Sequence, residues 1–435
     1  AEPTGNTLGM MMQLDYGNPN WIGRSMKTGK LIRDLWTDYN EQGHRHFRAN
    51  FMGATQVGTG DRMNDSWINY RAVSPASAVL AYNGNPAIAK VYTEIADGWL
   101  AAAMSTERGK PKGVIPAQVS FPDAVLGGTN SPNWYTASHP PGTVNYDWQR
   151  QQYKGYMLSI LFAAYNATGD PKYLEPIRLE YELAVKHGYV PEATGPLKRS
   201  RRKGPVKVDA PAGSEKWVAA QLAQTEKWFV AKQLLEGRSG PLENLWSKEQ
   251  IIESGHRAAE HMKTNWPIST SEAGPTDRVG FVGIVDPFFI YTGGSWGGPL
   301  LKAAVTYENT TKDFAAAVVA ADPQGLRICY YSLASDERTI GIVPWELEPG
   351  GTYRLAYGVD ADDDGKVDTV TEQRDFVFPQ HGWPIQIDVE PRTNYVVEID
   401  QLKRGKPAGP APDPGLAAED IRYNPDRTLL TARIH

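Results

Sequence analysis

Cysteine is almost absent from this chain of 435 residues, because Cys329 is the only one. A single cysteine cannot form an intrachain disulfide, so no disulfide framework supports the fold. The sequence also lacks a run of about 18 apolar residues, which a membrane-spanning helix requires. A formal net charge of −5 gives the whole chain no basic character for binding nucleic acid. We therefore expect no membrane span and no nucleic-acid partner.

Zinc-type cysteine and histidine clusters are missing, and no glycine-rich phosphate loop precedes a predicted helix. The sequence therefore predicts no organic cofactor. It begins with "AEPTGN", which has neither an initiator methionine nor an apolar signal region. This start is typical of a processed chain whose export signal would precede it.

Two or three domains are expected from the length, since a domain usually holds about 150 residues. With 41% hydrophobic and 22% charged residues, the composition is typical of a folded chain. Helical spacing of apolar residues dominates residues 1–275. Two stretches there, residues 147–170 and 171–187, form a predicted helical hairpin in which Asp170 is the cap and Pro171 the first helical residue. Further helices are predicted over residues 27–42, 85–104, 214–237 and 247–265.

The pattern changes to short strands at about residue 276. Runs such as "LRICYYSL" and "NYVVEID" alternate with turn signals such as "EPGGTY". We expect a β-sandwich of the immunoglobulin or fibronectin type over residues 276–403. A Pro/Gly-rich linker follows at residues 404–416, and residues 417–435 are expected to begin a further β domain that continues beyond this fragment.

The segment "YNATGDPKYLEPI" resembles the hairpin junction of helical-toroid carbohydrate enzymes, namely the six-hairpin glycosidases and the toroid polysaccharide lyases. The stretch "LEPGGTYRLAYGVDADDDGKVD" is similar to sandwich domains appended to large bacterial secreted enzymes. This resemblance implies an (α/α) toroid of helical hairpins followed by a sandwich, with a polysaccharide cleft formed by the loops at one end of the toroid.

Aromatic residues in the loops support a sugar ligand on physical grounds. Sugar faces stack on aromatic rings, and their hydroxyls bond to carboxylates, amides and guanidinium groups. Two stretches rich in such groups, "GHRHFRANF" at residues 43–51 and "GDRMNDSWINYR" at residues 60–71, are expected to line one cleft. The predicted substrate-binding residues are Trp67, Trp134, Tyr135 and Trp148.

Two kinds of polysaccharide cleavage remain open. A lyase acting on a uronic acid needs a group that neutralises the carboxylate, a base and an acid. The candidates for these roles are His44, His46, Asn64, Tyr70, Arg71, His139 and Tyr146. A hydrolase needs a pair of carboxyl groups, and the candidates are Asp61, Asp65 and Asp147. Because His44 and His46 are two residues apart, an extended backbone would place them on opposite faces, so at most one is expected to face the cleft.

A calcium loop is predicted in "DADDDGKVD", where aspartates occur at alternate positions. The predicted ligands are the side chains of Asp360, Asp362, Asp364 and Asp368 and the carbonyl of Lys366. The loop differs from an EF-hand because its twelfth position is Thr371 and no helices flank it. An acidic hairpin tip without metal is the alternative.

These patterns together predict a secreted, periplasmic or cell-surface enzyme that degrades a polysaccharide. Lyase action on an acidic glycan is favoured, because the candidate loops contain more His, Asn, Tyr and Arg than paired carboxylates. A glycoside hydrolase and a glycan-binding protein without activity are the alternatives.

Overall fold

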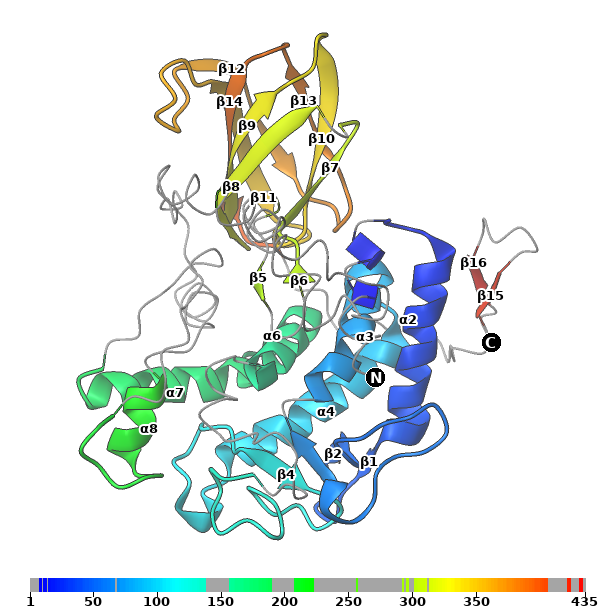
Figure 1. The fold of residues 1–435 in the computed structure, drawn as a ribbon, viewed down its shortest axis with the longest axis vertical. Helices are drawn as coiled ribbons and strands as arrows, with labels where there is room; N and C mark the ends of the chain where they lie inside the picture. The colour runs from blue at the N-terminus through cyan, green and yellow to red at the C-terminus, as the bar shows by residue number, and fades with distance from the viewer. Residues whose placement is uncertain are drawn as a thin grey trace. The chain divides into compact units, whose positions relative to one another are not determined.

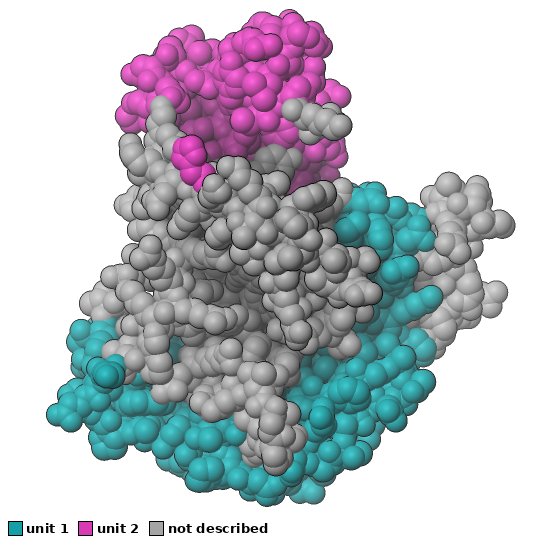
Figure 2. All heavy atoms as spheres, viewed as in Figure 1, with its two compact units in different colours: residues 1–193, 200–235, 407–435 teal, residues 194–199, 236–406 magenta. Residues whose placement is uncertain are grey.

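The chain divides into two compact units, which are drawn in different colours in Figure 2. One unit comprises residues 1–193, 200–235 and 407–435, and the other comprises residues 194–199 and 236–406. The computed structural model describes residues 8–9, 11–13, 15–66, 69–137, 156–189, 207–222, 256, 292, 295–296, 301–310, 313–405, 421–423 and 430–432.

The first unit is built mainly from helices, as predicted (Figure 1). α2 packs on α3, and α4 packs on α3, α6 and α7 around one apolar core. No helix in the described ranges is both long and apolar enough to cross a membrane. Its helical elements are α2 (Pro19–Leu31), η1 (Ile32–Trp36), η2 (Gly60–Arg62), α3 (Tyr70–Asn83), α4 (Pro86–Met104), η4 (Glu107–Gly109), α6 (Tyr156–Thr168), η5 (Pro171–Leu174), α7 (Glu175–Lys186) and α8 (Glu215–Leu222).

Helix α4 matches the predicted range 85–104 closely. Asn85 caps its first turn, where the side-chain oxygen accepts a hydrogen bond from the Ile88 N–H at 3.1 Å, and Pro86 is the first helical residue. A cap of this kind typically stabilises a helix by about 1 kcal/mol. Ile95 and Trp99 lie on its buried face. The predicted cap is also confirmed, since Asp170 accepts the Lys172 N–H, Pro171 begins η5, and η5 leads directly into α7. Among the described residues α6 packs mainly on α4 and α7 on α8, so these two helices do not pack on each other as the predicted hairpin requires.

The helix predicted at residues 27–42 has different ends in the structure. It begins earlier, at Pro19, and the helical conformation ends at Trp36 after one π-helical turn. The chain then forms β1 (Thr37–Tyr39), which pairs with β2 (Arg45–Phe47). Asn40 explains the reversal, because its side chain accepts the N–H groups of Gln42 and His44 and so closes the turn between the two strands.

A second short ribbon contacts the first one. β3 (Asn64–Ser66) pairs with β4 (Gln118–Ser120), and β2 contacts both β3 and α4. Backbone bonds extend the ribbon, since the Phe121 N–H donates to the Met63 carbonyl. These two ribbons and their connections, residues 37–66 and 105–137, are called the loop layer below.

The second unit has two antiparallel sheets that share one apolar core, which confirms a β-rich part after the helical part. The strand order is β13-β10-β7 in one sheet and β12-β11-β14-β9-β8 in the other. The strands are β7 (Val305–Glu308), β8 (Phe314–Asp322), β9 (Gly325–Ser332), β10 (Arg338–Pro344), β11 (Thr352–Val359), β12 (Thr369–Val377), β13 (Ile385–Val389) and β14 (Asn394–Lys403). A short ribbon of this unit is formed by β5 (Ser295–Trp296) with β6 (Leu301–Lys302). A further ribbon, formed by β15 (Ile421–Tyr423) with β16 (Leu430–Ala432), belongs to the first unit.

Side chains of the five-stranded sheet cover the open edge of β13. The Tyr357 hydroxyl accepts the Asp388 N–H at 3.2 Å, and the Tyr395 hydroxyl accepts the Glu390 N–H at 2.9 Å. Arg374 donates to the Gln386 carbonyl at 2.7 Å. Because these backbone groups already have partners, this edge cannot easily pair with another strand.

Candidate functional site

A buried carboxylate joins the two polar stretches that the sequence singles out. Asp65 is 0% exposed, and its Oδ2 lies 2.9 Å from His46 Nδ1 and accepts the Phe47 N–H at 3.3 Å. Its Oδ1 accepts a hydrogen bond from Asn69 Nδ2 at 3.0 Å. A buried charge needs such donors to offset the loss of water. Asp65 therefore ties β2, β3 and the start of α3 together.

Gly98 on α4 positions β2 from the other side. A Cβ atom at Gly98 would lie 2.6 Å from the Arg45 carbonyl and 2.9 Å from His46 Nε2, so only glycine permits this close approach. The His46 ring also contacts Trp99 edge to face, with 5.6 Å between centroids. Arg45 adds an ion pair to Glu94 of α4 at 2.7 Å. The polar stretch 43–51 is thus fixed directly on a core helix.

Burial separates the described catalytic candidates into two groups. His46, Asn64 and Asp65 are at most 2% exposed, so they contact other protein groups and not solvent. His44 is only partly buried, and Asp61 is exposed on η2. The two histidines therefore differ in exposure, in the sense expected from the alternation of an extended strand.

Several predicted residues fall outside the description. Tyr70 and Arg71 begin α3, but their side chains are not described. The residues wholly outside the described ranges are His139, Tyr146 and Asp147 among the catalytic candidates and Trp67 and Trp148 among the substrate-binding candidates. The structure therefore places neither the lyase set nor the hydrolase set in full.

Trp134 is a core residue in this structure. It is 2% exposed, and its ring lies edge-on to Tyr135, which in turn contacts Trp217 of α8. Gly213 allows the close packing of Tyr135, because a Cβ there would come within 2.4 Å of its ring. A sugar needs an exposed ring face, so the predicted stacking role does not fit Trp134 in this conformation.

An exposed group in the loop layer escaped the sequence prediction. Phe51 is 46% exposed, with Arg62 over its ring, and the neighbouring Asp61 is hydrogen-bonded to Asn130. Of these four residues only Asp61 was a candidate. The sequence signal was Phe51 at the end of the histidine-rich stretch, followed by the glycine-rich "GTGDR".

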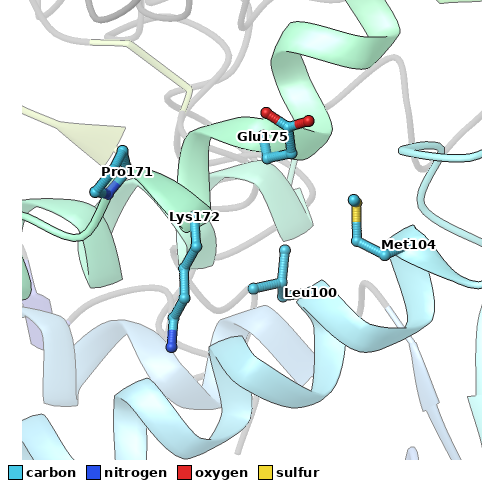
Figure 3. Close-up of a pocket in the computed structure, with 5 residues that line it drawn as sticks. All are labelled: Leu100, Met104, Pro171, Lys172 and Glu175. Carbon is cyan, nitrogen blue, oxygen red and sulfur yellow. The ribbon is translucent and has the colours of Figure 1, made fainter.

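A shallow pocket of about 360 Å³ lies between α4 and the segment formed by η5 and the start of α7 (Figure 3). Leu100 and Met104 line it from α4, Pro171 and Lys172 from η5, and Glu175 from the start of α7. The Lys172 ammonium lies 3.0 Å from Asp97 Oδ1, and Glu175 pairs with Arg178. These charged groups already have protein partners, and none of the predicted site residues line this pocket.

The first unit also contains a buried ionisable pair, Lys110 and Glu180. The Lys110 ammonium donates to the carbonyls of Ala103, Pro111 and Val114 at 2.6–3.1 Å. Burial lowers the pKa of Lys110 to about 7, although the charge of Glu180 opposes this shift. Burial raises the pKa of Glu180 to about 8, although the Ile115 backbone and Lys110 oppose it. Both groups thus titrate near neutral pH.

Three of the four predicted calcium-binding aspartates converge in the loop between β11 and β12. One carboxylate oxygen each from Asp360, Asp362 and Asp368 lies within 4.8 Å of the other two. Asp364 instead pairs with the Lys366 ammonium at 2.5 Å. Because calcium takes six to eight oxygen ligands, these three carboxylates would supply only part of its shell.

The Lys110–Glu180 pair predicts a minimum of stability between about pH 7 and 8. Because folding raises the pKa of Glu180 to about 8, the free energy of unfolding falls as the pH rises from about 4.5 to 8. Because folding lowers the pKa of Lys110 to about 7, the free energy of unfolding rises again from about pH 7 to 10.5. We expect Glu180→Gln to remove the fall between pH 5 and 7, which reaches at most about 1.4 kcal/mol per pH unit. Hydrogen exchange of α7 amides across this range would measure it.

Glu107→Gln, at an exposed position, serves as the control and should leave the profile unchanged. A Glu180→Gln profile that falls as steeply as the wild-type profile would show that Glu180 does not titrate in this range.

The aspartate loop predicts a calcium-dependent melting temperature for the second unit. A ligand at about 100 times its dissociation constant stabilises a fold by about 2.7 kcal/mol. Calcium should therefore raise the melting temperature in calorimetry, and a chelator should reverse the gain. Asp362→Asn should abolish this response, whereas Asp336→Asn, outside the loop, should preserve it. Identical melting curves with calcium and with chelator would contradict the site.

Comparison with known protein sequences identifies no family for this chain. No protein-family model and no curated protein sequence matches the chain.

Proposed function

We propose that the chain is a secreted polysaccharide-degrading enzyme that acts as a lyase on an acidic glycan containing uronic acid. In this proposal the helical unit belongs to an (α/α) toroid, the second unit is an immunoglobulin-like or fibronectin-like sandwich, and the loop layer forms the substrate cleft.

The observation that carries the proposal is the meeting of the two polar stretches. Asp65 contacts His46 and Phe47, the Asn50 N–H donates to the Arg62 carbonyl, and Arg62 covers Phe51. The described parts of the two stretches, residues 43–51 and 60–66, thus meet, which supports a shared cleft. Phe51, Asp61 and Arg62 are exposed there, and together with the Asn130 amide they offer a ring, a carboxylate, a guanidinium and an amide, which are groups that bind sugars.

Elimination needs three events at one sugar unit. A base removes the proton next to the carboxylate, the bond to the leaving glycosidic oxygen breaks, and a double bond forms while an acid protonates that oxygen. Tyr70, His139 and Tyr146 have the chemistry for the base and acid, and Arg71 for neutralising the carboxylate, whereas Asn64 is buried and bonded to the Asp61 carbonyl. Asp65 and His46, which are buried, would hold the surrounding backbone.

Hydrolysis by paired aspartates receives less support. Asp65 is fully buried and accepts three hydrogen bonds, so it is not available to attack a sugar or to activate water. Asp61 is exposed, but its described partner is the amide of Asn130. A hydrolase would therefore have to combine Asp61 with Asp147 or another carboxylate.

Glycan binding without catalysis is the second candidate function. Three catalytic candidates, His46, Asn64 and Asp65, are buried, whereas an aromatic and polar contact surface is exposed. This arrangement favours binding without catalysis. A binding protein requires only that surface.

The test is incubation with polygalacturonate, alginate, hyaluronan and chondroitin. We expect ultraviolet absorbance from unsaturated uronate ends to rise in step with reducing ends for at least one polymer. Tyr146→Phe should lower this rate at least about 100-fold, because it removes the hydroxyl that exchanges the proton, with an unchanged melting temperature.

Reducing ends without absorbance would replace the lyase by a hydrolase. Binding without new ends of either kind would favour the binding protein. If the chain neither cleaves nor binds any polymer of the panel, the proposed function itself is contradicted.

A further inference from the structure

Phe51 and Arg62 form an exposed pair on the connection between β2 and β3. The Arg62 guanidinium carbon lies 5.4 Å from the centre of the Phe51 ring. Gly58 permits this arrangement, because a Cβ there would lie 3.0 Å from Arg62 and 3.2 Å from Phe51. The backbone also holds the pair, since the Gly58 N–H donates to the Phe51 carbonyl and the Asn50 N–H to the Arg62 carbonyl.

The guanidinium of Arg62 has no carboxylate partner within the part of the chain that the structure describes, where its side-chain contact is the Phe51 ring. Asp61 precedes it, but Asp61 Oδ1 accepts Asn130 Nδ2 at 3.1 Å. Arg62, Asp61 and Asn130 are all exposed. A guanidinium offers five donors in a planar fork that matches a carboxylate, so this one is available to an anion from solution.

Asn64 connects this exposed group to the buried Asp65. Its Nδ2 donates to the Asp61 carbonyl at 3.1 Å, and the next residue along β3 is Asp65. The turn that carries Asp61 and Arg62 is therefore supported by the same buried polar contacts that fix β2 on α4. A ligand here would meet an anchored surface and not an isolated loop tip.

A uronic acid unit matches the chemistry of these four residues. Its apolar ring face can stack on Phe51, its carboxylate can form two parallel hydrogen bonds with Arg62, and its hydroxyls can bond with Asp61 and Asn130. A neutral sugar would use the ring and the hydroxyl partners but would leave the guanidinium without an anion.

We propose that Phe51, Asp61, Arg62 and Asn130 form a subsite for one uronic acid unit of the glycan. The subsite rests on the proposed function, since it assigns part of the same loop surface to one substrate unit. Arg62 supplies the preference for the acid, and Phe51 supplies contact area that is independent of charge.

The experiment measures dissociation constants by affinity electrophoresis of the whole chain. The probes are the four acidic polymers above, their carboxyl-reduced forms and chondroitin sulfate. Arg62→Ala should weaken binding of the best acidic polymer at least about ten-fold, or about 1.4 kcal/mol, and change binding of its reduced form less than about two-fold. Phe51→Ala should weaken both forms.

Arg24→Ala is the matched control, because Arg24 also lies over an aromatic ring, that of Trp21, at 5.5 Å on α2. It should bind like the wild type. Arg62→Lys should restore part of the affinity, since it keeps the charge but loses the planar fork.

If the wild type binds an acidic polymer and Arg62→Ala binds it equally well, the subsite is overturned while the proposed function survives. An effect of Arg62→Ala confined to chondroitin sulfate would assign Arg62 to sulfate and overturn the uronate subsite. A wild type that binds none of the probes would overturn both.

Discussion

The loop layer of the first unit depends on one buried carboxylate. Asp65 has no access to water, and its charge is stabilised by the donors of His46, Phe47 and Asn69. Because these donors come from β2 and from the start of α3, the chain cannot satisfy Asp65 unless both segments meet at β3. A buried charge that loses its partners is typically destabilising by about 3–5 kcal/mol, so the contact also selects this arrangement of loops over others.

The exposed turn of Asp61 and Arg62 is supported by this buried interior. Gly98 lets β2 approach the core helix α4. The Asn64 side chain donates a hydrogen bond to the Asp61 carbonyl, in the turn that presents Asp61 and Arg62. Buried polar groups thus lie beneath a surface that presents Phe51 and Arg62. This division suits a glycan site, where supporting hydrogen bonds fix the groups that contact the sugar.

Local signals predicted several of the regular elements, but not helix α3, which no predicted helix covers. Asn85 and Pro86 mark the start of α4, Asp170 marks the start of η5, and apolar alternation marks most strands of the second unit. The end of the helix before Thr37 was not predictable from periodicity, because it depends on pairing between β1 and β2. The site was predicted in part: the two stretches meet as expected, but the sequence could not show that His46 and Asp65 are buried or that Phe51 and Arg62 are exposed. Exposure depends on contacts with distant residues such as Gly98 and Trp99.

The most direct test of the central contact is the free energy of unfolding of Asp65→Asn. The amide replaces one accepting oxygen by a donor, which then faces the donors around it, so the variant should be less stable by about 2–3 kcal/mol. Asp38→Asn, at an exposed position of β1, should change stability by less than about 0.5 kcal/mol. Exchange of the β2 and α3 amides would localise the loss to the loop layer. An Asp65→Asn variant as stable as the wild type would contradict the view that this carboxylate holds the two stretches together.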